Sequence, residues 1–150
     1  MSDVKTKPMI LTEDQAMLRD TAAGFIADAA PIAHMRGLRD SGNADGFARD
    51  LWRQFGEMGF NGVIASEDDG GMGLGHVEAG ILLEQMGRNL TPSPFLSSAV
   101  GAVTALSGTM AGGEYLPGIV AGETLAALAI DEGVRHRPER IAMRAERSGN

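Results

Sequence analysis

Apolar side chains recur every three or four residues in several stretches of the chain, which is the spacing of one face of an α-helix. The first stretch follows residues 12–15, which read Thr-Glu-Asp-Gln, and continues to Ala29. The Thr-x-x-Gln order is that of a helix capping box, and we expect Pro31 to end or bend this helix. Residues 37–46 are polar and contain three glycines, so they predict a connection.

A second helix is predicted to begin near residues 43–45 and to end at Gly59, because glycine commonly closes a helix. A third is predicted from His76 to Arg88. Apolar residues surround most of its circumference, Val77 among them, so it should be buried on more than one side. Residues 60–65 (FNGVIA) lie between the two helices and are interpreted as an extended connector. The apolar stripe of the second helix consists of Phe47, Leu51, Phe55 and Met58, with Trp52 beside it.

Two shorter helices are predicted next. Ser93 would cap the first and Pro94 would take its first helical position, and small side chains continue from there to about Leu106. The second would run from Gly113 to Ala121. Its expected inward-facing residues are Tyr115, Leu116, Ile119 and Val120.

The pattern changes after Gly122, which we expect to stop the last helix. Residues 124–130 (TLAALAI) and 140–146 (RIAMRAE) predict strands. The sequence therefore predicts a mainly α protein, with a helical domain over residues 1–122 and the first strands of a β domain over residues 123–150.

Composition narrows the function. A length of 150 residues suits one domain. The net charge of -7 argues against a nucleic-acid partner, which needs clustered cations. The chain contains no cysteine, which excludes disulfides and thiol nucleophiles, and no apolar run is long enough for a membrane span. We expect a cytoplasmic protein.

Positive charge gathers near the end of the chain, at Arg135, Arg137, Arg140, Arg144 and Arg147.

Residues 65–75 (ASEDDGGMGLG) raise the question of a phosphate-binding loop. A Gly-x-Gly-x-x-Gly fingerprint that starts at Gly71 would need glycine where His76 stands, and one that starts at Gly73 would need it at Glu78. No Gly-Lys-Ser/Thr sequence is present. The preceding acids would also repel a phosphate. We interpret this loop as the turn that leads into the third helix.

Metal and nucleophile motifs are incomplete. Asn43, Asp45 and Gly46 match part of a calcium loop, but its first and twelfth positions would be Ser41 and Trp52. A helix cap with a turn glycine is the simpler interpretation. The three histidines lack metal-ligand spacing, and no serine lies in a Gly-x-Ser-x-Gly elbow, so no metal site and no catalytic residue is predicted.

The order of four segments resembles the N-terminal domain of the acyl-CoA dehydrogenase family. "LTEDQAMLRDTAAGFIAD" is similar to the first helix of that domain, and "LWRQFGEMGFNGVIASEDDGGMGLG" to its second helix and glycine-rich connection. "EAGILLEQMGR" resembles the next helix, and "EYLPGIVAGETLAALAI" resembles the entry into the middle sheet. The resemblance covers nearly the whole chain.

This resemblance implies a larger enzyme of lipid metabolism. It would have a helical N-terminal domain, a β middle domain and a C-terminal helical bundle, and would assemble as a homo- or hetero-oligomer around FAD. Such enzymes oxidise an acyl-CoA substrate at its α,β carbons and pass electrons to electron-transfer flavoprotein or a similar acceptor. The glutamate base belongs to the C-terminal domain, so these 150 residues should be inactive alone.

The resemblance also implies site residues. The helix that begins at Pro94 is similar to one whose inward face lines the acyl-chain slot. The entry strand is similar to one that touches the flavin. The implied slot residues are Pro94, Phe95, Ser98 and Ala102, and the implied cofactor contacts are Leu128, Ile130 and Asp131. Packing of helix against helix is an alternative role for the slot residues.

The chain departs from the family pattern after its entry strand. The usual Thr-Glu-Pro and Gly-Ser-Asp sequences are replaced by Asp131, Glu132 and Gly133 followed by "VRHRP". Hydroxyl donors for a flavin are therefore missing, which favours an alternative: a non-catalytic structural or heteromeric partner subunit of the same fold. Arg135 and Arg137 would either meet the phosphates of CoA or form a solvated basic turn. A free-standing helical interaction domain is a third interpretation.

Overall fold

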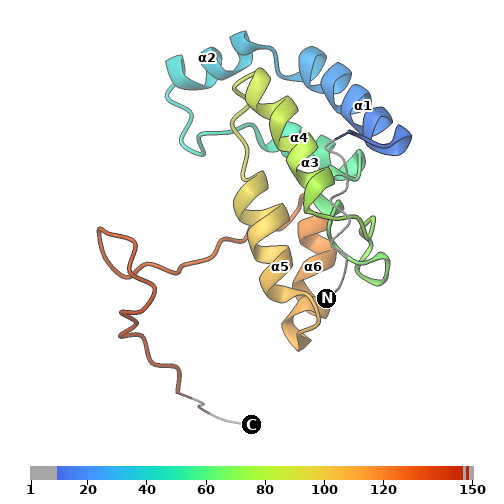
Figure 1. Ribbon diagram of the computed structural model, residues 1–150. Coiled ribbons are helices and arrows are strands. Elements are labelled where there is room, and N and C mark those ends of the chain that lie inside the picture. The colour runs from blue at the N-terminus through green and yellow to red at the C-terminus, as the bar shows by residue number, and fades with distance from the viewer. Residues whose placement is uncertain (1–9, 147, 149–150) are drawn as a thin grey trace.

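The computed structural model describes residues 10–146 and 148 and is helical throughout its folded part, which confirms the mainly α class (Figure 1). Its helices pack directly on one another. The α-helices are α1 (Glu13–Ala29), α2 (Ile32–Asp40), α3 (Arg49–Glu57), α4 (His76–Arg88), α5 (Val103–Leu106) and α6 (Met110–Val120). Shorter elements are the 3-10 turns η1 (Phe60–Gly62) and η2 (Glu67–Asp69) and the π-helix η3 (Leu96–Ala102).

Helix α1 begins at the predicted capping box. The Thr12 hydroxyl accepts a hydrogen bond from the Gln15 amide (3.2 Å), and the Gln15 side chain accepts one from the Thr12 amide (3.0 Å). The helix ends at Ala29, as expected before Pro31. The connection predicted over residues 37–46 is wrong in its first part, because α2 continues to Asp40. Pro31 restricts the backbone at the start of α2, and Gly37 lies exposed within this helix, which tolerates it at a cost of about 1 kcal/mol relative to alanine.

Aromatic residues form the centre of the core. The ring of Phe25 in α1 meets those of Phe55 and Phe60 edge-on, each at a centroid distance of 5.9 Å. Trp52 of α3 lies beside Phe55 and is 2% exposed. Gly59 has φ 77° and ends α3 as predicted, but the predicted start near residues 43–45 is wrong, because α3 begins at Arg49. Residues 60–62 are not extended but form the turn η1, which lets Phe60 point back into the core.

Helix α4 has the predicted bounds and packs against α1 (Figure 1). Its side chains are buried on more than one side, as expected, although Val77 is 60% exposed. The Glu78 carboxylate accepts hydrogen bonds from the Gln15 side chain (2.7 Å) and from the Gly75 amide (3.0 Å), so one carboxylate joins the starts of α1 and α4. The buried residues of α4 are Ala79, Ile81, Leu82, Gln85 and Met86.

The next helix differs from its prediction at the start. Ser93 does not cap it, because its hydroxyl faces the Met86 sulfur at 3.6 Å, and the helix begins at Phe95. The first seven residues after Phe95 form the π-helix η3, which continues into α5. A π turn holds an extra residue, and the small side chains permit this wider turn. A Cβ on Gly101 would lie 3.3 Å from the Leu96 carbonyl oxygen.

Helix α6 starts three residues earlier than Gly113, because Thr109 caps it by accepting a hydrogen bond from the Gly112 amide (3.1 Å). Leu116 and Ile119 are buried as predicted. Tyr115 is 46% exposed, so its inward placement was wrong: the next residue along the helix faces the core instead. Gly122 has φ 75° and stops the chain from continuing as a helix, as expected.

The strands predicted over residues 124–130 and 140–146 do not form in the described part of the chain, where the segment after α6 leaves the helical body without secondary structure (Figure 1). The reason is physical: a strand needs a neighbour to satisfy its backbone, and these residues have none here. Arg147 lies outside the described residues. The division at residues 122/123 stays a prediction. None of the described helices is long and apolar enough to cross a membrane.

Candidate functional site

The backbone amides of the glycine-rich loop before α4 are used in hydrogen bonds within the protein. The amides of residues 71–74 all donate to backbone carbonyls: Gly71 to Ser66 (2.8 Å) and Gly73 to Ala65 (2.8 Å) are two of these bonds. No amide of this stretch is left for a phosphate. The Ser66 hydroxyl accepts from the Asp69 amide (3.2 Å), and Glu67 and Asp68 are exposed. The interpretation as a turn is consistent with this geometry.

The partial calcium motif is likewise a turn. The Asn43 side chain accepts a hydrogen bond from the Gly46 amide (2.9 Å), and Asp45 pairs with Arg49 at 2.8 Å. The hydrogen bond from the Arg49 guanidinium lowers the pKa of Asp45. Across residues 10–146 and 148, no group of three or more acidic or histidine side chains is arranged to hold a metal ion.

Three of the four predicted slot residues are covered by the domain's own side chains. Phe95 and Ser98 are 0% exposed and Ala102 is 3% exposed, whereas Pro94 is half-buried. Phe95 belongs to the core cluster around α1 and α4, and Ala102 belongs to a second cluster with Leu116 and Ile119. The helix thus joins both cores, and contact of these residues with an acyl chain stays a prediction.

A cavity of about 240 Å³ lies at the start of this helix, against the end of α4. Leu90 there has φ 52°, a left-handed conformation that is uncommon for leucine, and is 56% exposed. Leu96, which faces the same cavity, is 64% exposed. Sequence reasoning missed this cavity, since no local pattern marks a leucine for positive φ. It is lined by Leu83, Met86, Gly87, Leu90, Thr91, Ser93 and Leu96.

The predicted cofactor contacts lie on the segment that leaves α6. Leu128 and Ile130 are 49% and 48% exposed. Asp131 accepts hydrogen bonds from the His136 ring (2.9 Å) and from the Arg137 amide (3.0 Å). These bonds, the His136 one first, lower the pKa of Asp131. Hydrogen bonds within its own loop therefore stabilise the ionised form of Asp131.

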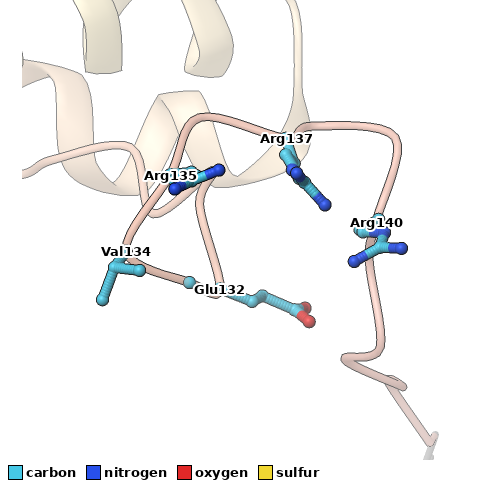
Figure 2. A pocket seen from close by; sticks show the side chains of 6 residues that line it. Glu132, Val134, Arg135, Arg137 and Arg140 are labelled. Carbon is cyan, nitrogen blue, oxygen red and sulfur yellow. The ribbon is translucent and has the colours of Figure 1, made fainter.

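Arginine side chains surround a cavity of about 440 Å³ in this loop (Figure 2). Arg135, Arg137 and Arg140 line it together with Glu132. Glu132 accepts hydrogen bonds from the Ala142 (2.6 Å) and Met143 (2.8 Å) amides, which closes the loop. In the part of the chain that the structure describes, none of the three arginines forms an ion pair. The lining of the cavity therefore carries an excess of positive charge, from three arginines and one glutamate.

Comparison with known proteins gives these features a context. A family model described as "Acyl-CoA dehydrogenase, N-terminal domain" matches residues 12–123. The chain belongs to the acyl-CoA dehydrogenase family. The resemblance noted from the four segments is thereby confirmed.

Two curated relatives illustrate the match. Acyl-CoA dehydrogenase IpdE2 of Mycobacterium tuberculosis is 30% identical over 120 residues, which are 79% of this chain and 37% of that protein. Mitochondrial isovaleryl-CoA dehydrogenase of Pongo abelii is 32% identical over an alignment 150 positions long, which covers 93% of this chain and 34% of that protein. The chain spans about a third of the length of the curated relatives that it matches.

Solved structures of this family share the fold. A variant of the Tcur3481-Tcur3483 steroid ACAD matches with a TM-score of 0.72 and 30% identity, over 81% of this chain and 34% of that one. The ChsE4-ChsE5 complex from Mycobacterium tuberculosis also gives a TM-score of 0.72, at 25% identity, over 83% of this chain and 35% of that one. The helical arrangement described above is therefore that of an acyl-CoA dehydrogenase N-terminal domain.

Proposed function

We propose that this chain is the N-terminal part of an FAD-dependent acyl-CoA dehydrogenase, which oxidises an acyl-CoA thioester at its α,β carbons. The observation that carries the proposal is the family match over residues 12–123, in a chain about a third as long as its relatives. In this proposal the domain shapes one side of the acyl slot and supplies no catalytic base. These residues alone are then inactive.

The proposed wall of the slot is the helix formed by η3 and α5. Its support is the neighbouring cavity of about 240 Å³, whose lining is mainly apolar and includes Leu96 of this helix, although none of the four predicted slot residues lines it. Pro94 stands half-buried at the start of this helix. Phe95, Ser98 and Ala102 are covered in this domain, and Phe95 and Ala102 belong to the two core clusters, so we propose that these two define the wall mainly by fixing the helix against those clusters.

We propose that the segment after α6 would hold a flavin through its backbone, because it lacks the hydroxyl donors of the family pattern. Residues 127–130 have no secondary structure and are exposed, so their N–H and C=O groups are available to a flavin edge. When bound, FAD would accept the hydride of the reaction. Leu128 and Ile130 would hold its ring through backbone contacts. The Asp131 carboxylate would stay hydrogen-bonded to the His136 ring and the Arg137 amide. We also propose that Arg135 and Arg137 meet the phosphates of CoA, which the basic cavity supports.

A second candidate is a partner subunit that contributes structure to a heteromeric dehydrogenase and binds no flavin itself. One observation favours it: the matching solved structure from Mycobacterium tuberculosis is described as a complex of two differently named components. The missing hydroxyl donors after Asp131 point the same way. The cytoplasmic location and the electron-transfer flavoprotein or similar acceptor remain part of the proposal, and no contact in the structure bears on them.

Purification of the product of the whole gene separates the two candidates. If the enzyme proposal holds, the protein carries flavin absorbance that bleaches when acyl-CoA thioesters of different chain length are added. A colourless protein that becomes active only when co-expressed with a flavin-bearing subunit would instead support the partner. A colourless protein that shows no activity in either setting would contradict both.

A further inference from the structure

Before it leaves the helical body, the segment that follows α6 contacts the helices through every second residue, namely Thr124, Ala126 and Leu128. The Thr124 side chain fills the space beside Gly118, where a Cβ would lie 2.5 Å from the Thr124 hydroxyl. Ala126 is bonded to Ser98. Leu128 lies over Gly101, at 3.5 Å from an added Cβ. This alternation has the period of a strand, although no neighbouring strand is present in the described residues.

Ser98 provides both hydrogen bonds at the centre of this contact. Its hydroxyl donates to the Ala126 carbonyl (2.7 Å) and accepts from the Ala126 amide (3.1 Å). A fully buried hydroxyl is costly unless it is bonded, and here both bonds go to a residue 28 positions away. The neighbouring Ser97 is exposed and donates to the Pro94 carbonyl of its own helix (3.0 Å). The Ser98 hydroxyl thus supplies the two hydrogen bonds that a neighbouring strand would otherwise give to the backbone of Ala126.

We propose that Ser98 is a positioning residue, whose hydroxyl fixes the path of residues 124–128 over η3 and thereby sets where Leu128, Ile130 and Asp131 stand. The part about the cofactor rests on the proposed function, whereas the docking of the segment does not. The wall of the acyl slot and the proposed flavin contacts would then move as one unit, since the same π-helix carries both. Gly101 assists by leaving room for Leu128.

Amide hydrogen exchange of the 150-residue chain, followed by NMR, tests the docking. The Ser98→Ala variant removes both hydrogen bonds to Ala126 and should raise the exchange rate there by at least about fivefold, since the net loss of a single hydrogen bond already has about that effect. The exchange of Leu82 in α4 should stay unchanged. Ser97→Ala is the matched control and should leave Ala126 as it is. Unchanged exchange at Ala126 in Ser98→Ala would overturn the proposal.

A second variant covers the case in which Ser98→Ala loosens the whole domain. Leu128 is half exposed, so Leu128→Ala should leave the helices intact while it removes the contact with Gly101 and raises exchange at Ala126. If exchange at Ala126 does not change in Leu128→Ala, the docking model is wrong.

The positioning role is read from the flavin spectrum of the whole-gene product. Ser98→Ala should shift the flavin absorbance band and lower the flavin-to-protein ratio, and Ser97→Ala should do neither. An unaltered spectrum in Ser98→Ala would overturn the positioning role. Should the whole-gene product bind no flavin, the exchange result still decides the docking, so failure of the proposed function and failure of this inference are distinguishable.

Discussion

Substitution of Gly71 by alanine should break the turn that leads into α4. An added Cβ would lie 2.6 Å from both the carbonyl carbon and the Cβ of Ala65, and still closer to the Ala65 carbonyl oxygen. Carbon atoms normally approach to about 3.5–4.0 Å, so the backbone must move by roughly 1 Å. That movement would also weaken the bond from the Gly73 amide to Ala65 (2.8 Å).

The expected loss in the free energy of unfolding is about 3 kcal/mol, of which overpacking contributes about 2 and the weakened hydrogen bond about 1. Urea unfolding followed by circular dichroism measures it. With an m-value of about 2 kcal/mol/M, the midpoint should fall by about 1.5 M.

Two glycines provide controls for Gly71→Ala. Gly80 lies in α4, is exposed and has no atom within 4 Å of an added Cβ, so Gly80→Ala should raise stability by about 0.8 kcal/mol. Gly70 has open space but φ 82°, so Gly70→Ala should cost about 1 kcal/mol through the backbone alone. If Gly71→Ala unfolds at the same urea concentration as Gly80→Ala, the close packing of this turn is refuted.

Three further predictions concern the core and its helix starts. Phe55→Ala should lower the free energy of unfolding by about 3–5 kcal/mol, because Phe55 is fully buried between Phe25, Trp52 and Phe60; a loss below about 1 kcal/mol in urea unfolding would contradict this packing. Thr12→Ala should cost about 1 kcal/mol in the same assay through loss of the α1 cap, and an unchanged midpoint would argue against the capping box. The Gln15 hydrogen bond lowers the pKa of Glu78 below the usual 4.5, so the folded state holds the ionised form more tightly than the unfolded state does. The stabilisation is therefore fully present above the unfolded pKa and is lost as the pH falls through the folded pKa. Thermal unfolding of Glu78→Gln between pH 6 and pH 3, about the span of that titration, should lack this component, and a pH dependence equal to that of the native chain would disprove it.

Helices were predictable where a few neighbouring residues determine them. The box at Thr12 and the stops at Gly59 and Gly122 depend on local hydrogen bonds and on backbone freedom, and all three are found. Helix α2 was missed because Gly37 and the polar residues around it resemble a connection. The error is local: α2 contributes no buried residue, so little in its sequence marks it as a helix.

The site depended on contacts that no sequence pattern reveals. The bonds between Ser98 and Ala126 span 28 residues, and the positive φ of Leu90 follows from its surroundings. The alternating pattern of residues 124–130 was a real signal, since Thr124, Ala126 and Leu128 do face one side. A strand also needs a neighbour, however, and the pattern alone cannot supply one.

The decisive measurement for the proposed function is the absorbance spectrum of the whole-gene product before and after addition of acyl-CoA. An acyl-CoA dehydrogenase should show the bands of an oxidised flavin, in a ratio close to one per subunit, and these bands should bleach when a suitable acyl-CoA is added. A well-folded protein that carries no flavin after reconstitution with FAD, and that leaves acyl-CoA unchanged, would contradict the assignment of this chain to a flavin-bearing acyl-CoA dehydrogenase.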